Sequence, residues 1–229
     1  MKAIALIPAR SGSKRLPRKN VVAFHGKPII AYSIEAAKDS GCFESVVVSS
    51  DDEEALRIAE RWGAEIEFRD PNLATDDARV KDVCVRFLGN QAAVDRHYDI
   101  LAVLYATAPL RTAADVRAVV NLIKPGYCHY ALATTRYPLP PHQALKRAED
   151  GSLEPMWADV LNRRSSEIPE LEVDNGSTYA VYIPAFLKAT GFYGPPGETY
   201  GHLMPRERSV DIDTREDMEL ASYYYSKTQ

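Results

Sequence analysis

The chain has 229 residues, with 28 lysines and arginines against 32 aspartates and glutamates, which gives a formal net charge of −4. Because there is no excess of positive charge, the composition argues against broad binding to nucleic acid or to an anionic membrane. With 45% hydrophobic and 26% charged residues it is typical of a soluble globular protein, and we expect a single domain over residues 1–229.

The cysteines and the N-terminus bear on the cellular compartment. Cys42, Cys84 and Cys128 are scattered and lack the C-x-x-C spacing of a zinc or redox site. Their odd number favours a reducing compartment over a disulfide framework. The N-terminal stretch has no apolar h-region of a signal peptide, and no apolar run approaches the length of a membrane span. We therefore expect a cytoplasmic protein.

The chain begins with an apolar run at residues 2–8, which is typical of a buried parallel strand. It leads into the basic stretch Leu6–Asn20, LIPARSGSKRLPRKN. The five cations of this stretch are Arg10, Lys14, Arg15, Arg18 and Lys19. Ser11 and Gly12 allow a ligand to approach the backbone closely, and the cations supply charge-assisted hydrogen bonds. A loop of this kind after a first strand predicts a polyphosphate site, and a solvated basic loop is the alternative.

Apolar runs then alternate with segments of helical periodicity. We expect strands at residues 45–49, 64–68, 99–105 and 128–134. We expect helices from Pro28 to a stop at Gly41, from an N-cap at Asp51 to about Trp62, from Val80 to a stop at Gly89, and over 113–123. This order predicts an α/β fold with a Rossmann-like, mostly parallel sheet and helices on both faces. Such sheets bind ligands at the carboxyl ends of their strands.

The alternation stops after residue 134. Residues 135–172 contain five prolines and two short runs around Glu149-Asp150-Gly151 that resemble a hairpin. We interpret this segment as an excursion from the main sheet, with a floppy surface loop as the alternative. Residues 177–183 have strand character again, and 184–191 is expected to be a short helix.

Two carboxylates stand close together near the end of the chain. Asp211 and Asp213 belong to a stretch that we expect to be extended, which puts both side chains on one side, about 6–7 Å apart. Carboxylate oxygens are hard ligands that suit Mg²⁺. Asp213 could instead only stabilise the start of the following helix. Thr214 and Asp217 form a capping box for that helix.

The motifs taken together resemble those of the acylneuraminate cytidylyltransferases, which are CMP-sugar synthetases for nonulosonic acids. The resemblance is carried by Ala9-Arg10, Ser13-Lys14, Leu16-Pro17, Lys19-Asn20 and Gly26-Lys27-Pro28. Within that family the chain looks closest to the pseudaminic acid type. The resemblance implies CTP and a nonulosonic acid as substrates, and Mg²⁺ held by Asp211 and Asp213. It also implies a homodimer in which segment 135–172 contributes to the partner's sugar site.

The same resemblance implies roles for residues around the nucleotide. The expected nucleotide-binding residues are Arg10, Ser11, Gly12, Lys19, Asn20, Arg69, Ala74 and Asp76. The last three belong to segments that match the family's closure over cytosine and ribose. As catalytic residues, Arg10, Lys14 and Lys19 would stabilise the charge of the triphosphate and of the leaving pyrophosphate. Asp211 would act through the metal.

The expected sugar-binding residues are Tyr105, Gln143, Arg164 and Asn175. Arg164 matches an arginine that helps bind the sugar carboxylate. Tyr105 and Gln143 stand where sialic acid enzymes usually carry Gln and Lys, which favours pseudaminic acid. A sialic, legionaminic or Kdo-type acid remains an alternative, as does a non-catalytic nucleotide-binding protein of this fold.

Overall fold

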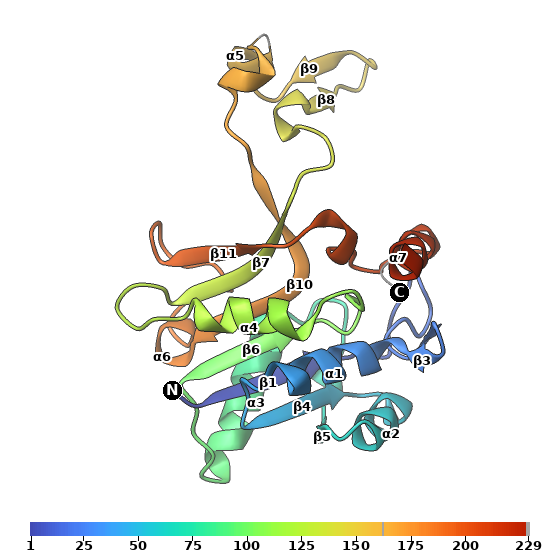
Figure 1. Cartoon of the computed structure of the whole chain (residues 1–229), viewed down its shortest axis with the longest axis vertical. Coiled ribbons are helices and arrows are strands. Elements are labelled where there is room, and N and C mark those ends of the chain that lie inside the picture. Colours follow the sequence, from blue (N-terminus) through green and yellow to red (C-terminus); the bar gives the residue numbers. More distant parts are fainter. Residues whose placement is uncertain (162, 228–229) are drawn as a thin grey trace.

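A seven-stranded sheet forms the centre of the computed structural model, which describes residues 1–161 and 163–227 (Figure 1). In spatial order the strands are β11 (Thr199–Leu203), β7 (Tyr130–Arg136), β10 (Glu172–Tyr182), β6 (Ile100–Leu104), β1 (Ala3–Pro8), β4 (Ser45–Ser50) and β5 (Glu65–Phe68). Strand β10 runs antiparallel to both of its neighbours, and the other adjacent pairs are parallel. The predicted, mostly parallel α/β sheet is confirmed.

Helices cover both faces of this sheet. On one face lie α1 (Ile29–Ser40), α2 (Glu53–Arg61) and α4 (Ala113–Asn121), and on the other lie α3 (Val80–Ala93) and α6 (Ile183–Phe186). Strand β1 shows why both faces are apolar: Ala5 and Ile7 pack on the first side, and Ile4 and Leu6 on the second. None of the helices within the described residues is long and apolar enough to cross a membrane.

The short hairpin of β2 (Ala23–Phe24) and β3 (Lys27–Pro28) joins the basic loop to α1. The last helix, α7 (Arg215–Lys227), packs beside it in a smaller apolar cluster with Phe24 and Ile29. The predicted capping box at the start of α7 is confirmed. The backbone N–H of Asp217 donates to the Thr214 hydroxyl, and the backbone N–H of Thr214 donates to the Asp217 carboxylate.

Some expected boundaries are wrong. Asp52, and not Asp51, caps α2, since its carboxylate accepts the backbone N–H of Glu54. Gly89 does not end α3, which continues to Ala93. A glycine costs a helix about 1 kcal/mol relative to alanine, and the buried face of α3 outweighs that cost. By contrast, Gly41 ends α1 with φ of 66°, as predicted.

Two further elements are placed differently from the expectation. The late strand begins at Glu172, earlier than the predicted 177, and the short helix covers Ile183–Phe186 rather than 184–191. Strand β11 was not predicted at all. Residues 209–213 follow it outside the sheet and carry the two aspartates of the predicted metal site.

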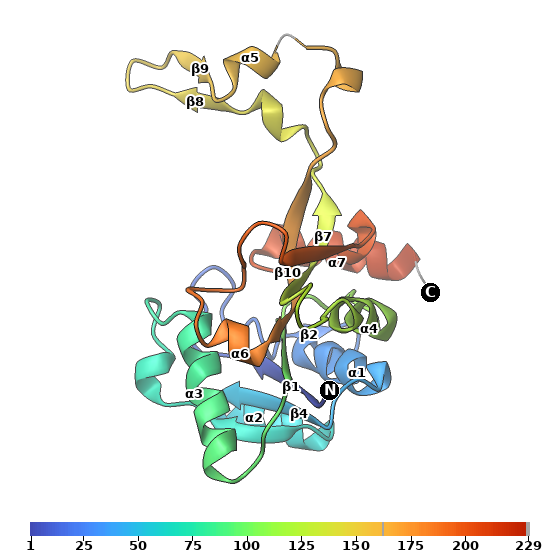
Figure 2. The ribbon, with the colours of Figure 1, turned by 90° about the vertical axis from the view of Figure 1, so that its left-hand side faces the viewer.

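Between β7 and β10 the chain leaves the sheet as an arm, residues 137–171 (Figures 1 and 2). The predicted hairpin is present as β8 (Leu145–Arg147) and β9 (Leu153–Pro155), and α5 (Ala158–Leu161) follows it. The arm exposes large apolar side chains, among them Leu139 at 75%. The excursion from the sheet is therefore confirmed, while its role in dimerisation stays a prediction.

Candidate active site

Several predicted site residues gather where the parallel strands of the sheet have their carboxyl ends, which we call the carboxyl edge or sheet edge. The basic loop leaves the carboxyl end of β1, where β4 and β6 also end, because these three strands are parallel neighbours. Strand β10 is antiparallel to β6, so its first residues lie at the same edge, with Thr178 opposite Leu104. A cavity of about 180 Å³ at this edge is lined by Pro8, Arg10, Lys19, Asn20, Arg69, Val80, Tyr105, Ala106, Thr107 and Asp211.

Two side chains fix the shape of the basic loop. The Asn20 amide donates to the carbonyl oxygen of Arg10 at 2.8 Å, so this predicted nucleotide residue folds the loop back on itself. Asp51 accepts the backbone N–H of Ser11 at 2.9 Å and the Ser11 hydroxyl at 2.5 Å. Sequence reasoning assigned Asp51 to a helix cap and missed this contact, which ties the loop to the end of β4.

Asp76 pairs with two cations of the basic loop. Its carboxylate lies 2.7 Å from Arg10 Nη1 and 2.5 Å from Lys14 Nζ. These hydrogen bonds, from Lys14 first and then Arg10, lower the pKa of Asp76 below its ordinary value. Ala74 and Asp76 also line an open cavity with Ser11 and Gly12. The predicted nucleotide residues of both segments are thus brought together.

Asp213 pairs with two other cations of the loop. Lys19 Nζ and Arg15 Nη2 each lie 2.6 Å from one of its oxygens. Burial would raise the pKa of Asp213, but the contacts with Lys19 and Arg15 outweigh it and lower the pKa. The remaining cation, Arg18, pairs with Glu54. Every cation of the loop therefore pairs with a carboxylate.

Arg69 lies buried beside the cavity. Its guanidinium donates to the carbonyl oxygen of Ser49 at 2.6 Å, at the end of β4. Burial lowers the pKa of Arg69, and the nearby charge of Asp51 partly opposes this shift. Arg69 thus presents a fixed positive charge next to Arg10, in a position suited to a nucleotide.

Asp211 is held in place by the turn that follows β6. The Thr107 hydroxyl donates to Asp211, and the Thr107 carbonyl oxygen accepts the backbone N–H of Ile212 at 2.9 Å. Gly176 lies so close that a Cβ there would be 3.1 Å from Asp211 Oδ2. Burial raises the pKa of Asp211, while the Thr107 hydrogen bond opposes the rise. Sequence reasoning missed Thr107.

The two aspartates suit a magnesium ion that arrives with a nucleotide. Within the described residues, no group of three or more His, Cys, Asp or Glu side chains could hold a metal ion. Mg²⁺, however, is commonly held by one or two carboxylates, with substrate phosphates and water completing its shell. Asp211 and Asp213 supply such a partial set next to the basic loop. Their chemistry fits Mg²⁺ as it is bound in phosphate sites.

Tyr105, which lines the cavity, belongs to a cluster of tyrosines around Asp174. The ring of Tyr105 meets the ring of Tyr179 edge-on, with centroids 5.7 Å apart. Asp174 accepts the hydroxyls of Tyr179 at 2.8 Å and of Tyr193 at 2.5 Å. Burial raises the pKa of Tyr105, and the charge of Asp174 adds to the rise. Sequence reasoning identified Tyr105 here and missed the other three residues.

Asn175 lies close to this group but uses its amide elsewhere. The side-chain nitrogen donates to Ser209 Oγ at 3.1 Å, and the side-chain oxygen accepts the backbone N–H of Ser177 at 3.1 Å. The pairing of β10 with β7 shifts register between Asp174 and Tyr179, which sets these directions. Asn175 therefore supports the segment that carries Asp211 and is buried.

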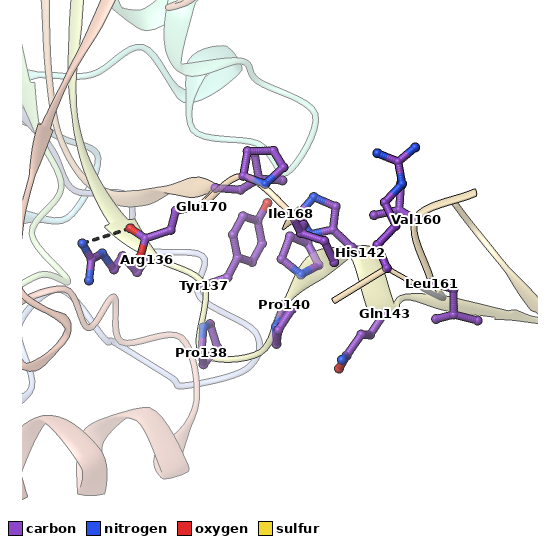
Figure 3. A pocket seen from close by; sticks show the side chains of 14 residues that line it. Arg136, Tyr137, Pro138, Pro140, His142, Gln143, Val160, Leu161, Ile168 and Glu170 are labelled. Atoms are coloured by element: carbon purple, nitrogen blue, oxygen red, sulfur yellow. Dashed lines mark ion pairs between the residues drawn. The ribbon is translucent and has the colours of Figure 1, made fainter. Parts of the chain in front are cut away.

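Gln143 and Arg164 belong to the arm, which projects away from the sheet (Figure 2). Gln143 lines a hollow of about 380 Å³ between the two ends of the arm, together with Tyr137 and Leu161 (Figure 3). An ion pair of 3.0 Å between Arg136 and Glu170 lies at its base. Within one chain the structure does not bring these two predicted sugar-binding residues to the cavity at the sheet edge.

Arg111 is a buried cation beneath the site. It is 4% exposed, and its guanidinium donates to Ser177 O at 2.5 Å and to Ser33 Oγ. Burial lowers its pKa to about 10. Arg111 joins the turn after β6 to β10 and α1, so it supports the site and does not face a ligand.

The sequence and the fold are similar to those of known proteins. The family model of the cytidylyltransferases matches residues 4–131. The chain is 34% identical to the pseudaminic acid cytidylyltransferase of Campylobacter jejuni, over 98% of this chain and 97% of that protein. It is 31% identical to the CMP-N,N′-diacetyllegionaminic acid synthase of Legionella pneumophila, over 96% and 94%. The fold matches that of a CMP:2-keto-3-deoxy-manno-octonic acid synthetase solved with CTP, at a TM-score of 0.74, 17% identity and full coverage of both chains.

Proposed function

Because this chain belongs to the cytidylyltransferase family, we propose that it transfers CMP from CTP to the anomeric hydroxyl of a nine-carbon 2-keto sugar acid. The hydroxyl oxygen bonds to the α-phosphorus as it loses its proton. The bond from that phosphorus to the bridging oxygen breaks, and pyrophosphate leaves. The observation that carries the proposal is the cation-rich loop at the carboxyl edge of the sheet, facing Asp211 and Asp213.

The basic loop would bind the triphosphate. Arg10, Lys14 and Lys19 would exchange their carboxylate partners for phosphate oxygens and stabilise the charge that develops on pyrophosphate. Arg69 would add a further positive charge on the nucleotide side, where burial strengthens its effect. Positioning and electrostatic stabilisation would then supply most of the rate enhancement.

Asp211 and Asp213 would hold Mg²⁺ together with phosphate oxygens of the nucleotide. When bound, the ion would neutralise phosphate charge and lower the pKa of a hydroxyl near it. Thr107 keeps Asp211 in place for this purpose, and Lys19 releases Asp213 when the lysine turns to phosphate.

We propose pseudaminic acid as the sugar acid. Tyr105 supports this choice, together with the 34% identity to the Campylobacter enzyme. The 31% identity to the legionaminic acid synthase is nearly as high, so the sugar needs a direct test. Arg164 would bind the sugar carboxylate from the arm of a second copy, because the arm of one chain projects away from its own sheet (Figure 2). The working enzyme would then be a homodimer, and we expect it in the cytoplasm.

The test is incubation of the protein with CTP, Mg²⁺ and a panel of pseudaminic, legionaminic, sialic and Kdo-type acids. We expect pyrophosphate release to be fastest with pseudaminic acid, with a CMP-sugar as the second product. Release with another acid alone would correct the sugar. CTP binding without turnover on any of these acids would favour the alternative of a non-catalytic nucleotide-binding protein.

A further inference from the structure

Asp115 is a buried carboxylate that the proposed reaction does not use. It lies at the start of α4, its side chain is 3% exposed, and it forms a capping box with Thr112. A capping box by itself needs only these two residues. Asp115 also accepts two hydrogen bonds from Arg208, at 3.1 Å from Nε and 2.9 Å from Nη2, and one at 3.2 Å from His202.

Arg208 stands directly before the segment 209–213, which carries Asp211 and Asp213. This segment does not belong to the sheet, so no strand pairing determines its path. Two contacts fix it from the other side: Thr107 binds Asp211 and Ile212. Thr107 lies in the connection between β6 and α4, and Asp115 lies in the first turn of α4. The connection from β6 into α4 therefore contacts Arg208, directly before the segment, and Asp211 and Ile212 within it.

The charges of this contact make it a strong one. Burial would raise the pKa of Asp115, but the hydrogen bonds of Arg208, Thr112 and His202 outweigh it and lower the pKa. A guanidinium that donates two parallel hydrogen bonds to one carboxylate fixes direction as well as distance. The side chain of Arg208 is 34% exposed and that of Asp115 is 3% exposed, so Asp115 is the buried member of the pair.

We propose that Asp115 is a positioning residue, which holds the carboxylates of Asp211 and Asp213 in place through Arg208. The inference rests on the proposed function only for the role of Asp211 and Asp213 in turnover, since the contact between Asp115 and Arg208 is independent of any activity. Misplacing a reacting group by about 1 Å can cost on the order of 100-fold in rate. Removing the contact between Asp115 and Arg208 should therefore lower kcat and leave the affinity of the basic loop for CTP unchanged.

The test uses Arg208→Ala, which removes the link and leaves the capping box of α4 in place. Arg206→Ala is the matched control, because Arg206 lies in the same short 3₁₀ turn (Arg206–Arg208) and is exposed. Arg208→Lys retains the charge but loses the paired hydrogen bonds. Hydrogen exchange followed by mass spectrometry reports the protection of residues 209–213, including the Ile212 amide bonded to Thr107, and peptides of β1 and β6 serve as internal references.

For Arg208→Ala we expect about tenfold faster exchange at 209–213, with β1 and β6 unchanged. We expect kcat to fall about 10- to 100-fold and KM for CTP to stay within about twofold. Arg208→Lys should lie between wild type and Arg208→Ala, and Arg206→Ala should match wild type. Unchanged exchange at 209–213, or a change spread equally over the sheet, would overturn the proposal. If the wild type turns over no sugar acid, the proposed function fails, and the exchange data still decide this inference.

Discussion

At the scale of single residues, Asp76 neutralises two cations of the basic loop from a separate segment of the chain. Its carboxylate binds Arg10 and Lys14, the cations that a triphosphate would need. The sequence predicted that Asp76 contributes to nucleotide binding. That assignment stays a prediction, and the two ion pairs lead to a second hypothesis, in which Asp76 competes with phosphate for Arg10 and Lys14.

We therefore expect Asp76→Asn to bind inorganic pyrophosphate more tightly than wild type, by about two- to tenfold, because two exposed ion pairs no longer oppose binding. Asp77→Asn is the control, since it removes the same charge from the next, exposed position. Isothermal titration calorimetry at fixed ionic strength measures both variants. Weaker binding in Asp76→Asn would mean that Asp76 contacts the ligand directly, as the sequence predicted.

The lowered pKa of Asp115 leads to a prediction on stability. A carboxylate whose pKa in the folded state lies below its ordinary value of 3.8 stabilises the fold above that value and loses this contribution as pH falls. Asp115→Asn should lower the free energy of unfolding by about 2 kcal/mol at pH 7, because it loses charged hydrogen bonds to Arg208. The deficit should shrink below about pH 4, because the unfolded wild-type chain then begins to bind a proton at Asp115 that the folded carboxylate still excludes.

Urea unfolding of wild type and Asp115→Asn between pH 3 and pH 8 measures this deficit. A deficit of equal size at every pH would show that shape, and not the charge of Asp115, causes the loss.

The residues that could be predicted from the sequence are those with a local signal. The cations between Arg10 and Lys19 stand within one loop, and Asp211 and Asp213 are two positions apart. The contacts that complete the site join residues that are far apart in the chain: Ser11 meets Asp51, and Thr107 meets Asp211. Neither the periodicity nor the residue spacing of the sequence predicts such long-range pairs.

At the scale of elements, the same distinction separates buried strands from exposed ones. Strands β1, β4 and β6 are buried along nearly their whole length and stand out as apolar runs. Strand β11 is an outermost strand of the sheet and has the sequence TYGHL, which includes a glycine and has no fully buried residue. Because an outermost strand is less buried, its sequence lacks the apolar run that predicts a strand. This explains why β11 was missed and why the path of 204–213 was not predictable.

For Gly176 in β10, we predict how an added side chain changes stability and turnover. Its φ is +69°, and a Cβ there would press on Asp211. Gly176→Ala should lose about 1–2 kcal/mol of stability through its backbone conformation and should also lower kcat, because Asp211 must move. Gly197→Ala is the matched control: its φ is +88°, but nothing lies within 4 Å of its Cβ position.

Thermal unfolding and pyrophosphate release of the two glycine variants separate the effects. We expect similar losses of stability in both and a loss of kcat in Gly176→Ala alone. Equal kcat values in the two variants would show that the contact between β10 and Asp211 does not matter to turnover.

At the scale of the whole molecule, the arm separates the predicted site residues into two groups. Arg10, Asp211 and Asp213 line cavities at the carboxyl ends of the parallel strands. Gln143 and Arg164 belong to the arm, which projects from the sheet (Figures 1 and 2). The arm also exposes Leu139, Met156 and Trp157, which favours a protein surface over water as their neighbour. The prolines and the hairpin of this segment could be predicted from the sequence. Its direction could not, since it depends on where β7 and β10 leave the sheet.

Subunit mixing tests whether the arm of one chain serves the cavity of another. Arg164→Ala should inactivate the arm's contribution, and Asp213→Ala that of the sheet edge, so each variant alone should be nearly inactive. In a dimer of one Arg164→Ala chain and one Asp213→Ala chain, one of the two sites would carry both changes and the other would carry neither. Random mixing makes half of the dimers mixed, so activity should recover to about a quarter of wild type.

The control mixes Asp211→Ala with Asp213→Ala. Both changes lie at the sheet edge, so each mixed dimer has a defect in both sites and should show no recovery. Native mass spectrometry must show that the chains have exchanged, and light scattering should give the mass of a dimer. Exchanged dimers without recovery in the first mixture would mean that the arm does not complete a neighbour's site. A monomer at working concentration would exclude the shared site altogether, because a projecting arm cannot then meet any cavity but its own.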